Sequence, residues 1–339
     1  MDDSPVTVFL PNYNHARYLP ESLGSLAAQT RPPSEIIIID DASTDGSAAI
    51  LEEFASRHSS VRFLRNETNQ GVVANENRAV RMAQGRYFFG LSADDRVAPE
   101  FLEKSLALLN RHPEAALCST PSYRIDEDGR NLGLYPTPVI SSQACYLSPE
   151  QVLATLRRRG SWFMGNATIW NRQSLLDLGD RPEDLDFFHD GFLSQVLGLK
   201  QGVCYLPEPL ADFRQVPGQK CEAGADLAAA LPVYERAMEL MRTTYRDLFP
   251  DDYIESFRRR TWANTIEASM DRAVRRHFDQ MRSRSSGGLR DRLFLLCARL
   301  FAKLHVCSAK LFLATLRHGY GGAIRRAFEK GLSLFRRRR

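Results

Sequence analysis

The chain has 339 residues, of which 43% are hydrophobic and 25% are charged, and these are the proportions of an ordinary globular protein. The length is sufficient for one large domain with an appendage, or for two domains. Because no run reaches about 18 uncharged apolar residues, we expect no transmembrane helix.

Charge is unevenly distributed along the chain. The net charge of +4 combines +13 in residues 281–339 with −9 in the remainder. A basic tail on an acidic body predicts contact with an anionic surface, either a membrane or a nucleic acid. The six cysteines are scattered without a Cys-x-x-Cys pair, and residues 1–5 are short and acidic. We therefore expect reduced thiols, no signal peptide and a cytoplasmic location.

The first part of the chain alternates between expected strands and expected helices. Four consecutive isoleucines, residues 36–39, predict a strand that is buried on both faces, as in a parallel sheet. The alternation with short connections indicates a mostly parallel α/β sheet with right-handed crossovers. The expected strands are residues 6–10, 35–40, 61–64 and 87–91, and helices are expected after the first three of them.

The pattern changes after residue 95. A helix over 99–110 and a strand over 115–122 are followed by a hairpin tip at 126–129 and an irregular loop over 136–149. Further on we expect helices over 151–158 and 191–199, β structure at 165–170, and a strand over 202–207. Beyond about residue 224 the sequence predicts helix throughout.

Two adjacent carboxylates, Asp94 and Asp95, follow the fourth strand. In an open α/β sheet, ligands bind beyond the carboxyl ends of the strands. Paired carboxylates there are suited to Mg²⁺ or Mn²⁺ and, through the metal, to phosphates. The alternative is a solvated turn that caps the helix starting near residue 99.

Three sequence blocks, taken together, resemble a known family. They are Val-Phe-Leu-Pro-Asn-Tyr-Asn at 8–14, Ile-Ile-Asp-Asp-Ala-Ser-Thr-Asp-Gly-Ser at 38–47, and Ser-Ala-Asp-Asp at 92–95. Their order is similar to that in the nucleotide-sugar half of glycosyltransferase family 2, over roughly residues 4–215. The resemblance implies the GT-A fold, which is a mostly parallel sheet flanked by helices, and an inverting enzyme. Here the chain carries a helical C-terminal extension, so we expect a GT-A domain at 1–222 and a helical, basic region at 223–339.

The resemblance also implies which residues hold the donor nucleotide. Tyr13 matches an aromatic or apolar position beside the uracil ring, and a flat ring contributes stacking at little entropic cost. Pro11 matches a backbone position near the base. Asp41 matches a uracil contact, where a carboxylate accepts the imide N–H, and this favours a UDP-sugar. The alternative for Tyr13 is packing within the turn, and the alternative for Asp41 is capping of the next helix. We expect Asp40 to support the turn that contains Asp41.

In the resembled family the Asp pair has two roles. Asp94 matches the ribose contact, and Asp95 matches the ligand of the metal that bridges the diphosphate. A cation there stabilises the charge that grows as the nucleoside diphosphate departs. Ala93 replaces a further carboxylate, so we expect modest affinity for Mn²⁺ or Mg²⁺, bound largely through substrate phosphates.

Phe187-Phe188-His189-Asp190 resembles the acidic pair that the family places at the start of a helix in the acceptor half. Asp190 keeps the second acid and would be the general base that takes the proton of the acceptor hydroxyl. His189 replaces the first acid; it orients Asp190, touches the acceptor, or is a structural histidine. A helix cap is the alternative for Asp190.

Further positions match the family less specifically. Asn77 and Arg78, with Asn75, fall where a helix presents polar residues to the donor, and a surface salt bridge is the alternative for Arg78. Arg214 falls in an aromatic–Arg segment near the pyrophosphate, but the histidine that often follows is missing. Asn166 resembles a residue of the donor-sugar pocket. Trp162 and Phe163 are either a platform for an acceptor sugar or part of the core.

Within residues 289–317, leucines at three- and four-residue spacing lie beside a narrow strip of Arg and Lys. This pattern predicts a helix in the interface of an anionic membrane, so we expect a peripheral location on the inner face of the cell membrane. The alternative is a helix packed on the catalytic domain or on a second subunit, which would give a homodimer. We expect no nucleic acid, because no aromatic–basic module is present.

The sequence as a whole therefore predicts a metal-dependent glycosyltransferase that moves a sugar from a nucleotide donor to a glycan or lipid-linked acceptor. One alternative is a sugar nucleotidyltransferase, although residues 11–14 lack the glycine-rich, basic loop that such an enzyme needs. The other is a non-catalytic protein that binds nucleotide sugars.

Overall fold

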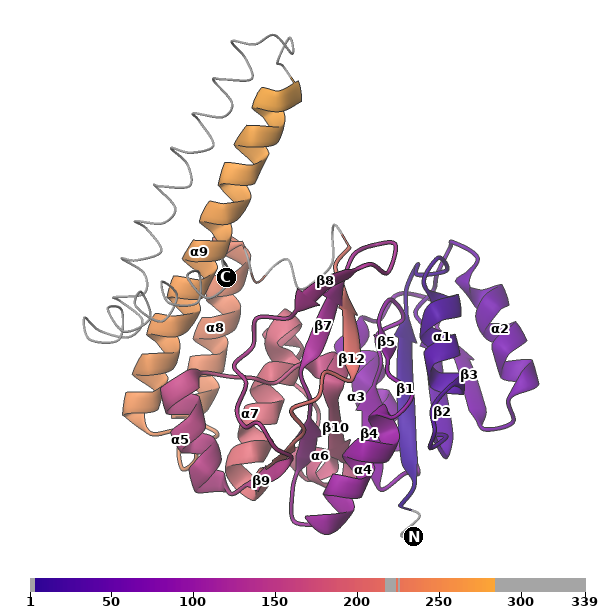
Figure 1. The fold of residues 1–339 in the computed structure, drawn as a ribbon, viewed down its shortest axis with the longest axis horizontal. Helices are drawn as coiled ribbons and strands as arrows, with labels where there is room; N and C mark the ends of the chain where they lie inside the picture. Colours follow the sequence, from indigo (N-terminus) through magenta and orange to yellow (C-terminus); the bar gives the residue numbers. More distant parts are fainter. Residues whose placement is uncertain (1–3, 217–223, 225, 284–339) are drawn as a thin grey trace, which may run out of the picture. The chain divides into compact units, whose positions relative to one another are not determined.

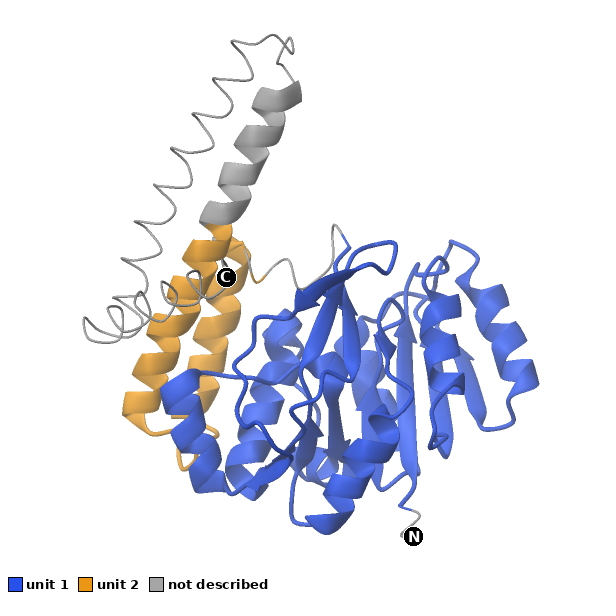
Figure 2. Cartoon of the chain, in the orientation of Figure 1, with its two compact units in different colours: residues 1–217 blue, residues 218–339 orange. Residues whose placement is uncertain are grey.

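The computed structural model describes residues 4–216, 224 and 226–283. Its contacts divide the chain into two units, residues 1–217 and residues 218–339, which are coloured separately in Figure 2. Among the helices of the described residues, none has the length and apolar character needed to cross a membrane. The amphipathic pattern of residues 289–317 lies outside the described residues.

Within residues 4–216, the first unit is built on an eight-stranded mixed sheet. Six of these strands run in one direction, whereas β10 and β9 run antiparallel to their neighbours. The expectation of a mostly parallel sheet is confirmed. In spatial order the strands are β3 (Val61–Arg65), β2 (Glu35–Asp40), β1 (Val6–Asn12), β4 (Tyr87–Gly90), β10 (Thr168–Asn171), β6 (Leu117–Ser119), β11 (Val203–Tyr205) and β9 (Cys145–Leu147).

Helices flank this sheet (Figure 1). Helix α5 begins with a capping box, in which the Ser148 hydroxyl accepts from the Gln151 N–H and the Gln151 side chain accepts from the Ser148 N–H. The helices of the unit are α1 (Leu19–Ala27), α2 (Ser47–Arg57), α3 (Val72–Met82), α4 (Phe101–Arg111), α5 (Pro149–Arg159), α6 (Arg172–Leu178) and α7 (His189–Gln201), with 3₁₀ turns η1 (Gly165–Ala167) and η2 (Glu183–Phe188).

The core of the unit lies on both faces of β2 and β1. Each isoleucine from Ile36 to Ile39 is at most 4% exposed, which confirms the prediction made from their run. Burying each side chain stabilises the fold by roughly 1.5–3 kcal/mol. The parallel pairing of β1 with β2 aligns Asn12 with Asp40, so the polar residues that follow both strands lie at one edge of the sheet.

Of a second, four-stranded sheet, the sequence predicted only the hairpin tip at 126–129, which the structure confirms. The sheet has the order β5 (Arg96–Val97), β12 (Ala211–Arg214), β7 (Ser122–Ile125) and β8 (Asn131–Leu134) within the described part of the first unit. Strands of two to four residues are too short to show a repeating pattern. Through β5 and β12 this sheet reaches the residues directly after Asp95.

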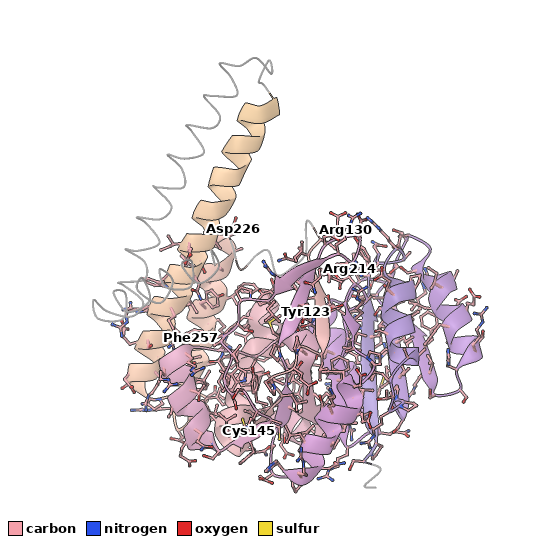
Figure 3. The ribbon with its side chains drawn as sticks, in the orientation of Figure 1. Tyr123, Arg130, Cys145, Arg214, Asp226 and Phe257 are labelled. Carbon is pink, nitrogen blue, oxygen red and sulfur yellow. The ribbon has the colours of Figure 1, made fainter. Side chains whose placement is uncertain are left out.

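The second unit contains helices α8 (Leu227–Arg242) and α9 (Asp251–Ser283) in its described part, as expected from the sequence. The side chain of Asp226, labelled in Figure 3, caps α8 by accepting the N–H groups of Ala228 and Ala229. The two helices pack through Tyr234 and Phe257, whose rings meet edge to face at 6.1 Å. Within this unit, Val233, Met241 and Ile254 are among the buried apolar side chains.

Candidate active site

The turns that follow β1 and β2 are tied together by buried polar side chains. Asp40 is fully buried and accepts hydrogen bonds from Asn12 at 2.8 Å and from the Ser43 hydroxyl at 2.5 Å. Asn14, at φ 57°, receives the Thr44 N–H on its side-chain oxygen at 2.8 Å. The bonds define the shape of the turn, and Tyr13 is left 47% exposed within it. Pro11 lies beside it in β1, aligned with Ile39.

Asp41 holds a different loop in place. Its carboxylate accepts the side-chain N–H of Asn66 and the backbone N–H groups of Gln70 and Gly71, all at 2.8–2.9 Å. Burial tends to raise the pKa of Asp41, but these hydrogen bonds and one from Asn75 outweigh it, so the pKa is lowered. Asp41 is not a helix cap, because α2 begins at Ser47 and Asp45 accepts the Ser47 N–H.

Arg78 belongs to the same network as Asp41, whereas Asn77 does not. The Arg78 guanidinium donates to Asn66 at 3.1 Å, and Asn66 in turn donates to Asp41. Asn77 exchanges two hydrogen bonds with the backbone of Arg181, so both polar groups of its amide are occupied within the protein. The structure therefore gives Asn77 a packing contact between α3 and the segment before η2.

Asp94 and Asp95 lie in a tight turn after β4. Both are buried, at 7% and 1% exposure, and neither caps α4, which begins at Phe101 after Glu100. Burial and the neighbouring charge of Asp94 raise the pKa of Asp95 well above its usual range, against the opposing effects of Arg214 and of the Asn166 amide. The charge of Arg214 compensates this carboxylate only in part, and a divalent cation would supply further counter-charge.

The donor set fits a cation that is bound mainly through its substrate. Within the described residues, no group of three or more His, Cys, Asp or Glu side chains could hold a metal by itself. Mg²⁺ and Mn²⁺ in phosphate-transfer sites take one or two carboxylates and complete their shell with phosphate oxygens and water. Asp95, with Asp94 beside it, offers such a partial set.

Arg214, labelled in Figure 3, organises the turn that contains the Asp pair. Its backbone N–H donates to the Asp95 carboxylate at 2.8 Å, and its Nε donates to the Asp94 carbonyl at 2.7 Å. The guanidinium also contacts the carbonyls of Asp126 and Glu127 and the Glu21 carboxylate, and it lies over the Tyr18 ring at 4.9 Å. Arg214 is fully buried, so we expect it to position the Asp pair rather than to touch the pyrophosphate.

Replacing Arg214 by Met is expected to lower the free energy of unfolding by about 3–5 kcal/mol, because it strips buried acceptors of their donors. Urea denaturation followed by circular dichroism measures this loss. The control is Arg17→Met: Arg17 is 58% exposed and pairs with Glu127 and Asp128, and such surface pairs contribute less than about 1 kcal/mol. Equal losses in the two variants would contradict the positioning role.

Asp190 is in the first turn of α7 and is partly exposed. One carboxylate oxygen accepts the Gly191 N–H at 2.6 Å. The other oxygen lies against Gly165, where a β-carbon would overlap it. Because the helix begins at His189 with Phe188 as its cap residue, Asp190 is not the cap.

A single 3₁₀ turn, η1, therefore connects Asp190 with Asp95. Gly165 contacts Asp190, and the next residue, Asn166, has a side-chain amide that lowers the pKa of Asp95. Asn166 is 8% exposed, and its carbonyl oxygen accepts the Ser122 hydroxyl at 3.2 Å. The amide nitrogen is buried and lies close enough to Asp95 to lower the pKa of that carboxylate. Asp95 and Asp190, which are 95 residues apart in the sequence, thus lie beside two consecutive residues of one turn.

Several of the less specific candidates belong to the interior. Trp162 and Phe163 are 2% and 9% exposed and their rings pack at 4.4 Å, so they form part of the core and not a sugar platform. Asn75 is buried and accepts a hydrogen bond from Asn66. Sequence reasoning did not single out Glu21 or Glu76, because an acidic residue on a helix carries no signal of its distant partner.

Comparison with known proteins places these features in context. The model of the family described as glycosyl transferase family 2 matches residues 7–161. The putative glycosyltransferase EpsE of Bacillus subtilis is 34% identical over 205 residues, which cover 57% of this chain and 70% of EpsE. The chain spans 57% of the length of the uncharacterized mycobacterial relatives that it matches.

Two solved structures share the fold. Staphylococcus aureus TarS 1–349, in complex with UDP-GlcNAc, has a TM-score of 0.58 at 17% identity, over 96% of this chain and 92% of that chain. The mannosyltransferase PcManGT from Pyrobaculum calidifontis, in complex with GDP-Man and Mn²⁺, has a TM-score of 0.55 at 18% identity, over 96% and 87% of the two chains. These likenesses confirm the predicted GT-A fold.

Proposed function

The chain belongs to glycosyl transferase family 2, and we propose that it is an inverting, metal-dependent glycosyltransferase. It transfers a sugar from a UDP-sugar to a hydroxyl group of a glycan or lipid-linked glycan. The observation that carries this proposal is the convergence of Asp95 and Asp190 on η1, because a base and a diphosphate site must lie within one sugar of each other. The nucleotide sugars bound to TarS and PcManGT support a donor of this class.

Asp190 acts as the general base in this proposal. Its carboxylate takes the proton of the acceptor hydroxyl while that oxygen forms a bond to the anomeric carbon. The bond from the anomeric carbon to the diphosphate breaks on the opposite side, so the configuration inverts and the leaving group departs as UDP. The hydrogen bond from Gly191 and the contact with Gly165 hold the carboxylate in one orientation for this step.

The donor is held at the edge formed by β1, β2 and β4. The exposed ring of Tyr13 stacks on uracil, with the Pro11 backbone alongside. Asp41 accepts hydrogen bonds from Asn66, Asn75, Gln70 and Gly71 within the protein, so it meets the imide N–H of uracil by exchanging one of these bonds. Asp94 contacts the ribose, and Arg78 lies on the helix that faces the nucleotide. A divalent cation at Asp95, Mn²⁺ or Mg²⁺, would supply counter-charge to the diphosphate.

A donor screen tests the function. The full chain is incubated with UDP-glucose, UDP-galactose, UDP-GlcNAc, UDP-glucuronate and GDP-mannose, each with Mn²⁺ or with EDTA, and release of the nucleoside diphosphate is measured. We expect release from one UDP-sugar, and loss of that release in EDTA. UDP binding without release from any donor, with or without added glycan acceptors, would favour the non-catalytic alternative. Pyrophosphate release from UTP and a sugar 1-phosphate would favour the nucleotidyltransferase.

We further propose that residues 1–222 form the catalytic domain and that 223–339 include a peripheral membrane anchor. The support is the basic, amphipathic sequence of residues 289–339, in which each Lys or Arg near an anionic bilayer adds about 1 kcal/mol. Replacing Arg336–Arg339 by serine in the full chain is expected to weaken cosedimentation with phosphatidylglycerol vesicles at least tenfold. Arg57→Ser, at a 70% exposed side chain of α2, is the control. Equal binding to vesicles of neutral lipid would contradict the anchor.

A further inference from the structure

A cluster of buried charges lies directly behind the start of α7. The Nε2 of His189 is 3.1 Å from one carboxylate oxygen of Glu76, and the Nη2 of Arg181 is 3.4 Å from the other. The side chain of His189 is 13% exposed, that of Glu76 is 8% exposed and that of Arg181 is 4% exposed. Glu76 comes from α3, Arg181 from the segment before η2 and His189 from α7, so the cluster ties α3 to the segment that leads into α7.

The contacts of His189 determine its protonation. Its Nδ1 is 2.5 Å from the carbonyl oxygen of Asp186, and its Nε2 faces the Glu76 carboxylate. Both partners are acceptors, and a neutral imidazole carries only one N–H. The ring satisfies both contacts only as an imidazolium. Burial lowers the pKa of His189, but the hydrogen bond and charge of Glu76, the charge of Asp190 and the Asp186 carbonyl outweigh it and raise the pKa.

The Glu76 carboxylate is in the ionised form that an imidazolium partner requires. Burial alone would raise its pKa, whereas the charge of Arg181 and the hydrogen bond and charge of His189 lower it. The carboxylate therefore lies ionised between two cations. Removing a single partner from such a buried group leaves the others uncompensated, so the cluster holds its geometry only as long as His189 keeps both protons.

The backbone before His189 is strained. Asp186 has φ 36° and ψ −116°, within an otherwise helical turn, and such a conformation costs a non-glycine residue roughly 1–3 kcal/mol. The hydrogen bond from His189 to the Asp186 carbonyl stabilises this bend. The bend in turn sets the direction in which α7 begins, one residue before Asp190.

We propose that His189 is a cationic positioning residue for Asp190: paired with Glu76 and bonded to the Asp186 carbonyl, its imidazolium fixes the first turn of α7 so that the Asp190 carboxylate stays against Gly165. This inference rests on the proposed function of Asp190 as the base. It assigns the pH dependence of the reaction to a group that does not touch the substrate. The charged groups that act on the ring are Glu76 and Asp190, and Arg181 pairs with the other oxygen of Glu76.

The sign of the pH effect follows from the raised pKa of His189. The cation persists above the usual histidine value of about 6.5 and is lost as the pH rises through the folded-state pKa. Deprotonation would break the contact with Glu76 or with Asp186 and release the bend. We therefore expect kcat for UDP release from the UDP-sugar found in the donor screen to fall on the alkaline side.

The unsubstituted protein provides the first test. In the full chain labelled with ¹⁵N-histidine, ring nitrogen shifts should show His189 doubly protonated at pH 7, with a pKa above about 6.5. The midpoint of the alkaline fall in kcat should coincide with that pKa. Separate midpoints, or a ring that is neutral at pH 7, would overturn the proposal. Because the NMR measurement needs no turnover, a doubly protonated His189 in a protein without activity would instead count against the proposed function.

Substitutions provide the second test. His189→Gln should lower kcat at least tenfold, change the donor KM less than twofold, and abolish the alkaline fall. Glu76→Gln, which keeps the side-chain size, should move the fall to lower pH, because the imidazolium loses the charge and hydrogen bond that raise its pKa. The control is His112→Gln, at a ring 3.4 Å from the exposed Glu114, and no change is expected there. Unchanged kcat and pH profile in His189→Gln would overturn the positioning role.

Discussion

Replacing Asp190 by Asn is expected to lower kcat by about 10²–10⁴-fold, the usual contribution of a general base. Asn has nearly the same shape and keeps an oxygen to accept the Gly191 N–H, so the fold and donor binding should remain. What is lost is the ability to take the proton of the attacking hydroxyl. Steady-state UDP release at saturating donor and Mn²⁺ measures the fall, and the donor KM should change less than twofold.

The control for Asp190→Asn is Glu183→Gln on η2, an exposed acidic residue seven positions earlier. It removes the same charge from the same region without touching Gly165. Gly165→Ala should reproduce part of the loss, because its methyl group displaces the Asp190 carboxylate. If Asp190→Asn and Glu183→Gln behaved alike, Asp190 would not be the base and only nucleotide binding would remain of the proposal.

Replacing Asp95 by Asn is expected to lower the rate of UDP release at least 10³-fold and yet to stabilise the metal-free protein. The rate falls because the diphosphate loses its cation site. Stability rises because the folded-state pKa of Asp95 is raised, so ionising this carboxylate destabilises the fold as the pH rises through that value. Asn carries no such charge, and we expect a gain of roughly 1–2 kcal/mol at pH 7 in EDTA, as is common when a functional site is relieved.

Asp41→Asn is the matched control for this second prediction, because Asp41 is also a buried carboxylate. Its pKa is lowered in the fold, so its charge contributes stability that is present at neutral pH and lost as the pH falls through the folded-state pKa. Urea denaturation at pH 7 in EDTA should therefore show a loss for Asp41→Asn and a gain for Asp95→Asn. Calorimetric titration of Mn²⁺ at saturating UDP should fail for the Asp95 variant and persist for the Asp41 variant, which needs more UDP to reach saturation. A retained manganese response in that variant would exclude Asp95 as the ligand.

The sequence alone was sufficient to predict the strands that form the donor edge of the sheet. The isoleucine run of β2 and the apolar residues of β1 and β4 are typical of strands that are buried on both faces of a sheet. This pattern can be recognised in a short stretch of sequence. The polar residues that end these strands, from Tyr13 to Asp41 and Asp95, could be located for the same reason. Parallel strands bring their carboxyl ends to one edge, so their approach to each other follows from the strand order.

Only the tertiary structure decided what the buried polar side chains do. The sequence suggested Arg214 for a phosphate and Asn77 for the donor, but long-range contacts direct Arg214 to the Asp94–Asp95 turn and Asn77 to Arg181. The pairing of Glu76 with His189 spans 113 positions. The packing of the elements determines such partners. A hydrogen bond between distant residues produces no repeating pattern in the sequence from which it could be predicted. Local patterns therefore determined the scaffold, and packing determined the surroundings of Asp190.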